Sequence, residues 1–212
     1  MSKLLVFISY SSANKHLAGN IKKCFQTYSG FEVFVAHDDI MPATNWEINI
    51  LKNLRKTDLF IPLLTDNYRN SEFTDQELGM ALALGKIIIP LKFSTLNPYG
   101  FFRTTQALKC TEENKGLVNA VTATIFLLTN NPDYKLLDTP TKDAVISALS
   151  KSTSYKTTST ILGMLTKLSG FTRNQLTAIT HCFENNIKVS KEPHMAPKFK
   201  KLLLTKYGIN VD

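Results

Sequence analysis

Short apolar runs and segments of helical periodicity alternate over the first 128 residues of the chain. The apolar runs are rich in β-forming residues, which predicts buried strands at residues 3–9, 31–36, 59–64, 87–93 and 106–110. Between these runs apolar residues recur every three or four positions, which predicts helices at residues 13–28, 46–56, 71–84 and 115–128. This alternation is typical of a parallel sheet whose crossover helices cover both faces.

A different pattern follows residue 128, where no strand signal appears. Residues 129–141 have the Asn, Asp and Pro content of a linker. Helices are expected beyond them, near residues 142–150, 156–168, 172–185 and 196–207. The third of these begins at Thr172, with Gln175 at the position that completes a capping box. The expected division is a first domain over 1–130, a linker over 131–140 and a small all-helical module over 141–212.

Composition narrows the class of protein. Hydrophobic residues make up 43% of the 212 residues and charged residues 20%, which supports a packed core. No apolar run reaches the roughly 18 residues that a membrane span needs, so no membrane partner is expected. The cysteines at 24, 110 and 182 lie far apart, which predicts a cytoplasmic protein with neither a disulfide framework nor a metal site. A Rossmann GxGxxG motif is missing, which argues against a dehydrogenase.

The net charge of +8 is concentrated in the C-terminal part. Residues 129–212 contain 12 lysines and arginines against 6 acidic residues, whereas residues 1–128 contain 13 against 11. Two explanations remain open for this basic excess. One is a polyanionic partner such as nucleic acid, recognised through the helix at 172–185 and the lysines that follow residue 197. The other is an ordinary set of solubilising lysines.

Ligands of parallel sheets bind beyond the carboxyl ends of the strands, which points to the polar segments that begin at Ser9, His37 and Thr65. The first strand ends in Ser9, Tyr10 and Ser11, whose hydroxyl and amide groups suit ribose or phosphate oxygens. A plain serine-rich turn is the alternative interpretation. The second polar segment, residues 37–46, contains Asp39 and ends at the single Trp46. It is a candidate lid or interaction surface, and core packing of Trp46 is the alternative.

A third feature is an acidic side chain at the edge of an apolar helix face. Phe73 and Glu77 lie one turn apart in the helix predicted at 71–84, so they share a face next to the stripe that contains Leu78. A carboxylate beside an aromatic ring at the rim of a sheet-end cleft is an unusual place for a merely solvated acid. A boundary glutamate paired with a lysine is the alternative.

Four segments together resemble the TIR (Toll/interleukin-1 receptor) domain family, in the family's order and spacing over about residues 1–130. They are FISYS at Phe7–Ser11, DxIxPxxxW at Asp38–Trp46, DLFIPLLTDNYRNS at Asp58–Ser71 and SxFTxxEL at Ser71–Leu78. The resemblance implies a flavodoxin-like doubly wound parallel sheet, followed here by the helical module. The chain departs from the family pattern at Phe73 and Thr74, where Trp and Cys are common, and at Ala43, which replaces a frequent Gly.

Many TIR domains cleave NAD+ at the nicotinamide–ribose bond through a glutamate on the helix after the third main strand, a position that maps to Glu77. The resemblance therefore implies an NAD+ nucleosidase in which Glu77 is catalytic, NAD+ is the substrate and no separate cofactor is used. It assigns substrate binding to Ser9, Tyr10, Ser11, Asp39, Trp46 and Phe73.

The same resemblance implies partners and a biological setting. They are self-association through the TIR domain, bacterial antiphage defence and a downstream effector that reads a linear, cyclic or conjugated ADP-ribose product. The alternative is a TIR adaptor without catalysis that acts through TIR–TIR assembly. Adaptor TIR domains often lack the glutamate, so its presence favours the enzyme.

Overall fold

The computed structural model describes residues 3–35 and 46–211, and of Trp46 it describes the backbone alone. The chain separates into two compact units. The sheet unit comprises Leu4–Gln26 and Phe31–Thr124, and the helical unit comprises Thr27–Gly30 and the chain from Ile125 onward, together with Lys3.

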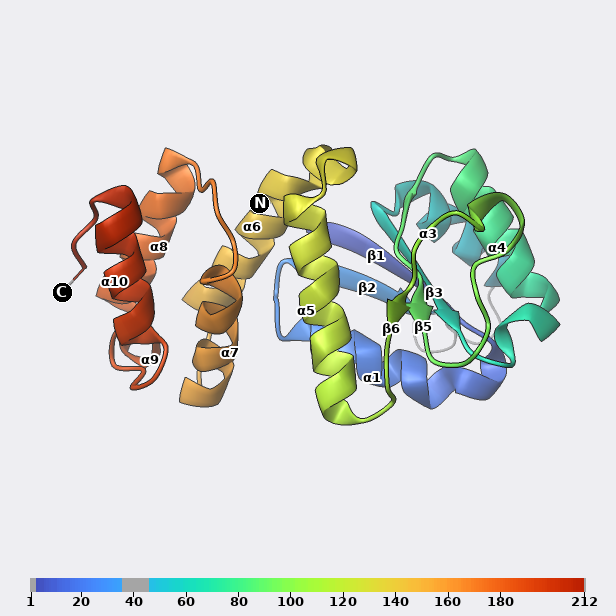
Figure 1. Ribbon diagram of the computed structural model, residues 1–212, viewed down its shortest axis with the longest axis horizontal. Helices are drawn as coiled ribbons and strands as arrows, with labels where there is room; N and C mark the ends of the chain where they lie inside the picture. Colours follow the sequence, from blue (N-terminus) through green and yellow to red (C-terminus); the bar gives the residue numbers. More distant parts are fainter. Residues whose placement is uncertain (1–2, 36–45, 212) are drawn as a thin grey trace. The chain divides into compact units, whose positions relative to one another are not determined.

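The sheet unit contains a parallel sheet flanked by helices (Figure 1). Its strands are β1 (Leu4–Ser9), β2 (Phe31–Val35), β3 (Leu59–Leu64), β4 (Ile87–Ile88), β5 (Leu91–Lys92) and β6 (Leu108–Lys109). They run in the order β2-β1-β3-β5-β6, with β4 also paired to β3. Every pairing is parallel. If β4 and β5 are counted as one interrupted strand, the order is that of a flavodoxin-like doubly wound fold, which confirms the predicted fold class.

The strand expected at 87–93 is divided in two, which corrects the prediction at this point. Pro90 lies in the gap between β4 and β5, where a residue without an N–H cannot continue the ladder. Pro62 of β3 lies opposite the same gap, since β4 pairs with Leu59 and Phe60, and β5 with Leu63 and Leu64. The two prolines therefore share one break in the sheet.

The helices of the sheet unit fall where the periodicity predicts them. They are α1 (Lys15–Gln26), α3 (Trp46–Lys56), α4 (Glu72–Ala83) and α5 (Asn114–Asn130), which runs on into the helical unit. Short 3-10 turns stand at η1 (Ser12–Asn14), η2 (Tyr68–Asn70) and η3 (Gly100–Phe102). The core centres on β3, which is buried along its whole length as its continuous apolar run indicates. The ring of Phe60 in this strand stacks on that of Phe7, with centroids 5.6 Å apart.

The helical unit contains no strand within the part of the chain that the structure describes. Its elements are η4 (Pro132–Tyr134), α6 (Lys135–Ser150), α7 (Tyr155–Leu165), α8 (Arg173–Asn185), α9 (Ile187–Ser190) and α10 (Ala196–Tyr207). The segment 131–140, for which a linker is expected, forms η4 and the first turns of α6. The side chain of Asn131 accepts from the N–H of Asp133, and Pro132 suits the first position of the turn. The division of the chain into domains stays a prediction.

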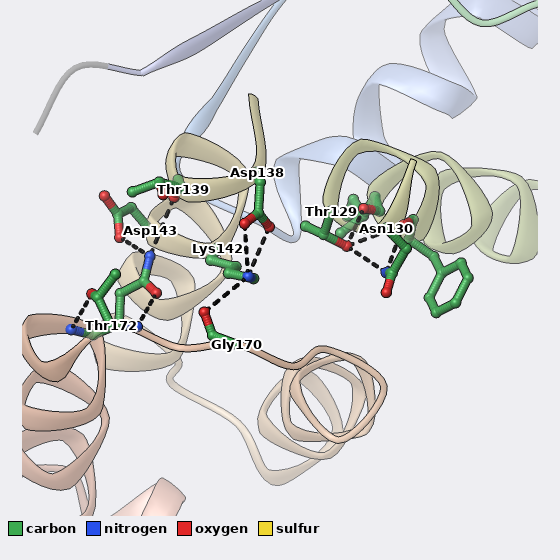
Figure 2. A network of polar contacts seen from close by, with 11 residues as sticks. Thr129, Asn130, Asp138, Thr139, Lys142, Asp143, Gly170 and Thr172 are labelled. Carbon is green, nitrogen blue, oxygen red and sulfur yellow. Dashed lines mark hydrogen bonds and ion pairs between the residues drawn. The ribbon is translucent and has the colours of Figure 1, made fainter. Parts of the chain in front are cut away.

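A polar network holds α6 against the segment that leads into α8 (Figure 2). The buried amine of Lys142 lies 2.8 Å from a carboxylate oxygen of Asp138 and donates to the carbonyl oxygen of Gly170 at 3.2 Å. The side chain of Gln175 donates to Asp143 at 2.7 Å and accepts from the N–H of Thr172, which confirms the predicted capping box. The charges that this unit buries are thus met by partners.

Candidate active site

Glu77 is a buried acid in the middle of α4, with only 8% of its surface exposed. The helix begins after Ser71, and Glu72 and Asp75 in its first turn suit the positive end of the helix dipole. From that start, the helical repeat turns Glu77 and its neighbour Leu78 toward the protein interior. The local sequence therefore places a carboxylate on the buried side of the helix.

One hydroxyl group from another element contacts this carboxylate, and a second hydroxyl group contacts the first. The Oγ of Ser9, at the carboxyl end of β1, donates to Oε2 of Glu77 at 2.6 Å. The same Oγ lies 3.0 Å from the phenol oxygen of Tyr68, in the η2 turn that follows β3. Ser9 and Tyr68 are both buried. The carboxyl ends of two adjacent parallel strands thus converge with α4, as expected of a ligand site in this class of sheet.

The buried surroundings of Glu77 disfavour the ionised form of its carboxyl group. Burial raises the pKa of this carboxyl group to about 7, and the hydrogen bond from Ser9 partly opposes the rise. Within the described part of the chain, no lysine or arginine forms an ion pair with it. A carboxyl group that changes its protonation state near neutral pH, without a cationic partner, is typical of a functional site.

A cavity of about 320 Å³ lies beside Glu77, between α3 and α4. Its lining residues are Glu47, Ile50, Leu51 and Leu54 from α3, and Phe73, Gln76, Glu77 and Met80 from α4. Apolar walls with a few polar groups are the usual composition of a small-molecule site. The cavity therefore offers an apolar surface on which a ring can pack, next to one carboxylate.

The structure brings together three of the residues predicted from the sequence. Ser9 contacts Glu77 directly, and Phe73 lines the cavity with it, although 42% of the Phe73 side chain is exposed. Tyr10 and Ser11 are buried just after β1 and do not line this cavity, so their binding role stays a prediction.

The predicted polar segment at residues 37–46 lies almost wholly outside the described residues. Asp39 lies outside the described residues, and Trp46 begins α3 with its side chain outside them.

Sequence reasoning missed two contributors. Tyr68 reaches Ser9 from the segment after β3, and Glu47 is a second acid in the cavity lining. The available signal for Tyr68 was an aromatic residue with a hydroxyl within the polar stretch that follows a buried strand. Its ring is buried in the core, where only a tertiary structure pairs its hydroxyl with Ser9.

The described residues contain no group of three or more His, Cys, Asp or Glu side chains arranged to hold a metal ion. Among the same residues, no helix has both the length and the apolar character needed to cross a membrane.

Comparison with known proteins gives a family match and several structural likenesses, of which two are described here. The family described as "TIR domain" matches residues 6–121, more than half of the chain and a span that includes Glu77. The TIR domain of the Toll-related receptor TRR-2 from Hydra magnipapillata is 19% identical, with a TM-score of 0.43 over 49% of this chain and 81% of that chain. The CMP N-glycosidase BcmB of Clostridium botulinum is 20% identical, with a TM-score of 0.41 over 57% of this chain and 98% of that chain. No curated protein sequence matches the chain.

Proposed function

The chain belongs to the TIR domain family, and from that premise we propose that it cleaves the bond between nicotinamide and ribose in NAD+. The observation that carries the proposal is Glu77, a buried carboxylate that has no cationic partner among the described residues and that lines a cavity between α3 and α4. Glycosidic bonds of this kind break through an oxocarbenium-like state of the sugar. A carboxylate close to that sugar stabilises the positive charge as it develops.

The chemistry requires one carboxylate rather than two. Nicotinamide leaves as a neutral molecule from a cationic precursor, so no general acid has to protonate it. With a pKa of about 7, roughly half of the Glu77 population is ionised at neutral pH. A bound pyridinium cation favours the ionised form further, because opposite charges lower a carboxyl pKa. Substrate binding therefore prepares the group that the reaction needs.

The cavity suits the reacting end of the substrate. Its volume of about 320 Å³ is at the lower end of the range for ligand sites, which fits a nicotinamide ring and its ribose rather than a whole dinucleotide. Phe73 and Met80 supply apolar surface for the ring, while Glu77 faces the sugar. The remaining phosphates and adenine would lie outside this cavity, where Tyr10, Ser11, Asp39 and Trp46 remain the proposed contacts.

Three products are compatible with this reaction. Capture of the sugar cation by water gives ADP-ribose, capture by an adenine nitrogen of the same molecule gives a cyclic isomer, and an added nucleophile gives a conjugate. Self-association through the TIR domain, a downstream effector that reads the product, and a role in antiphage defence belong to the same proposal.

The test is nicotinamide release from NAD+, followed by chromatography, with mass spectrometry to identify the second product. Glu77→Gln keeps the size of the side chain but removes its charge, and we expect at least a roughly 100-fold loss of activity. Glu72→Gln is the matched control, because it removes the same charge from an exposed position on the same helix. Equal release by wild type and Glu77→Gln would refute the proposal. Absence of release in the wild type across a range of pH and protein concentrations would favour the non-catalytic adaptor.

A further inference from the structure

The contact between Ser9 and Glu77 is one link of a longer chain of hydroxyl groups. Ser9 has one hydroxyl proton, and at 2.6 Å from Oε2 this proton is engaged by the Glu77 carboxylate. The oxygen of Ser9 can therefore only accept from Tyr68, which lies 3.0 Å away. Burial raises the pKa of Tyr68 well above its usual value, so its phenol keeps the proton that it donates. With Glu77 ionised, the direction of the chain is fixed: Tyr68 donates to Ser9, and Ser9 donates to Glu77.

The far end of the chain is held by the turn after β3. The N–H of Tyr68 donates to the carbonyl oxygen of Thr65 at 3.1 Å, and the Tyr68 carbonyl accepts from the hydroxyl of Thr74 at 2.6 Å. That hydroxyl also contacts the carbonyl oxygen of Ser71 at 2.7 Å, which ties the first turn of α4 to η2. The sequence departure at Thr74 thus places a strong donor where a cysteine would offer a weak one.

A second link joins the loops that follow β1 and β3. The hydroxyl of Thr65 donates to the side-chain oxygen of Asn14 in η1 at 2.8 Å. The two segments that supply Ser9 and Tyr68 are therefore connected to each other as well as to α4. The hydroxyl chain ends on a supported framework rather than on a free loop.

We propose that Tyr68 and Ser9 are positioning residues that engage Oε2 of Glu77 and so leave Oε1 to meet the ribose of the substrate. This role rests on the proposed cleavage of NAD+, because it presupposes that Glu77 acts on the ribose of that substrate. Within the described residues, Oε1 has no hydrogen-bond partner, while Oε2 has Ser9. A chain of hydroxyls also polarises itself, so the Tyr68 proton strengthens the bond that Ser9 makes to the carboxylate.

Other titratable groups lie near the chain, and none of them duplicates it. Glu47 of α3 lines the same cavity, and Asp75 of α4 and Tyr99 interact electrostatically with Tyr68. None of these three is a basic residue, so none supplies a cation to Glu77. The hydrogen bond from Ser9, whose oxygen accepts from Tyr68, is thus what favours the carboxylate form at this site.

The test combines single-atom deletions with a direct measurement on Glu77. Ser9→Ala and Tyr68→Phe each remove one oxygen and leave the packing, and Tyr99→Phe is the matched control, because its hydroxyl contacts Asp75 and not Ser9. Carbon-13 NMR of labelled glutamate carboxyl groups in the full chain reports the titration of Glu77 whether or not the protein turns over NAD+. We expect Ser9→Ala to titrate about one pH unit higher than wild type, Tyr68→Phe to move by less in the same direction, and Tyr99→Phe not to move.

Activity supplies the second measurement. A rise of one pH unit lowers the ionised fraction at pH 7 about fivefold, so kcat/KM of Ser9→Ala should fall about fivefold there and recover in part above pH 9. An unchanged Glu77 titration in both folded variants would overturn the positioning role. A shifted titration with an unshifted pH profile of kcat/KM would overturn it too. If wild type cleaves no NAD+ but the Glu77 titration still shifts in the two variants, the hydrogen bonding of Ser9 and Tyr68 to the carboxylate site is supported. Only the proposed function then fails.

Discussion

The two units of the molecule bury ionisable groups under opposite conditions. In the helical unit, the amine of Lys142 is met by the carboxylate of Asp138 and a carbonyl oxygen. Glu192 in the same unit accepts from the N–H groups of His194, Met195 and Ala196 at the start of α10. In the sheet unit, Glu77 has one serine hydroxyl and no cation among the described residues. The first arrangement satisfies its charges and the second leaves a charge only partly satisfied.

The pKa directions express the same contrast. Burial raises the pKa of Glu192, but the backbone hydrogen bonds outweigh it and the net pKa lies below the usual value. Burial raises the pKa of Glu77 to about 7, and a single hydroxyl does not offset it. A buried group whose charged form is stabilised contributes to the fold, whereas a buried group whose charged form is strained is retained at a cost to stability. Lys142 and Glu192 therefore have the environment of structural residues, whereas the environment of Glu77 supports the functional role proposed for it.

The largest effect should come from breaking the ion pair of the helical unit. Lys142→Met keeps the length of the side chain but leaves Asp138 and the Gly170 carbonyl without their cation. We expect the free energy of unfolding of the helical unit to fall by about 3 kcal/mol. This is the low end for a broken buried ion pair, because the Asp138 side chain is 30% exposed. Hydrogen exchange read by mass spectrometry on peptides of α6 and α8 measures it, with the exposed Lys151→Met as control. A loss below 1 kcal/mol would remove the structural half of the comparison.

The second prediction concerns Glu77, whose replacement should raise the free energy of unfolding instead of lowering it. The folded-state pKa of Glu77 lies above the ordinary value of 4.5, so its contribution to stability is complete below pH 4.5 and is lost as pH rises through about 7. The difference between the folded-state pKa and the ordinary value corresponds to about 3 kcal/mol of free energy of unfolding at high pH. Glu77→Gln removes the strained charge and part of the Ser9 hydrogen bond, so the sheet unit should gain about 2 kcal/mol at pH 8 and little at pH 4.5.

Urea unfolding at the two pH values tests this prediction, with Glu72→Gln as the matched control. A destabilised Glu77→Gln at pH 8 would mean that the carboxylate supports the fold, and the functional assignment would lose its energetic basis.

Most of the fold, but only part of the candidate site, could be predicted from the sequence. The continuous apolar run at Leu59–Leu64 predicts a fully buried strand, and the Thr172 cap predicts the start of α8, because both signals are local. The break at Pro90 was missed, since a proline between two apolar pairs looks like part of one strand. The helical face identifies Glu77, but the hydroxyl that contacts it belongs to Ser9, 68 positions away, and Ser9 is contacted in turn by the hydroxyl of Tyr68. Their convergence depends on the pairing of β1 with β3, which no local pattern encodes.

The smallest change in the free energy of unfolding should come from replacing Glu192, whose carboxylate accepts from N–H groups at the start of α10. Glu192→Gln keeps an oxygen acceptor but removes the negative charge beside the positive end of the helix, so we expect a loss of about 1 kcal/mol at pH 7. Because the folded-state pKa of Glu192 lies below its ordinary value, its stabilisation is present above that ordinary value and disappears as pH falls through the folded pKa. Wild type and Glu192→Gln should therefore differ at pH 7 and converge in acid. Glu77→Gln should also converge with wild type in acid, but from the more stable side, so two glutamates in one chain would show opposite signs at neutral pH. Equal signs for the two variants, in urea unfolding at pH 7 to 8, would show that burial alone and not the set of hydrogen-bond partners decides the outcome.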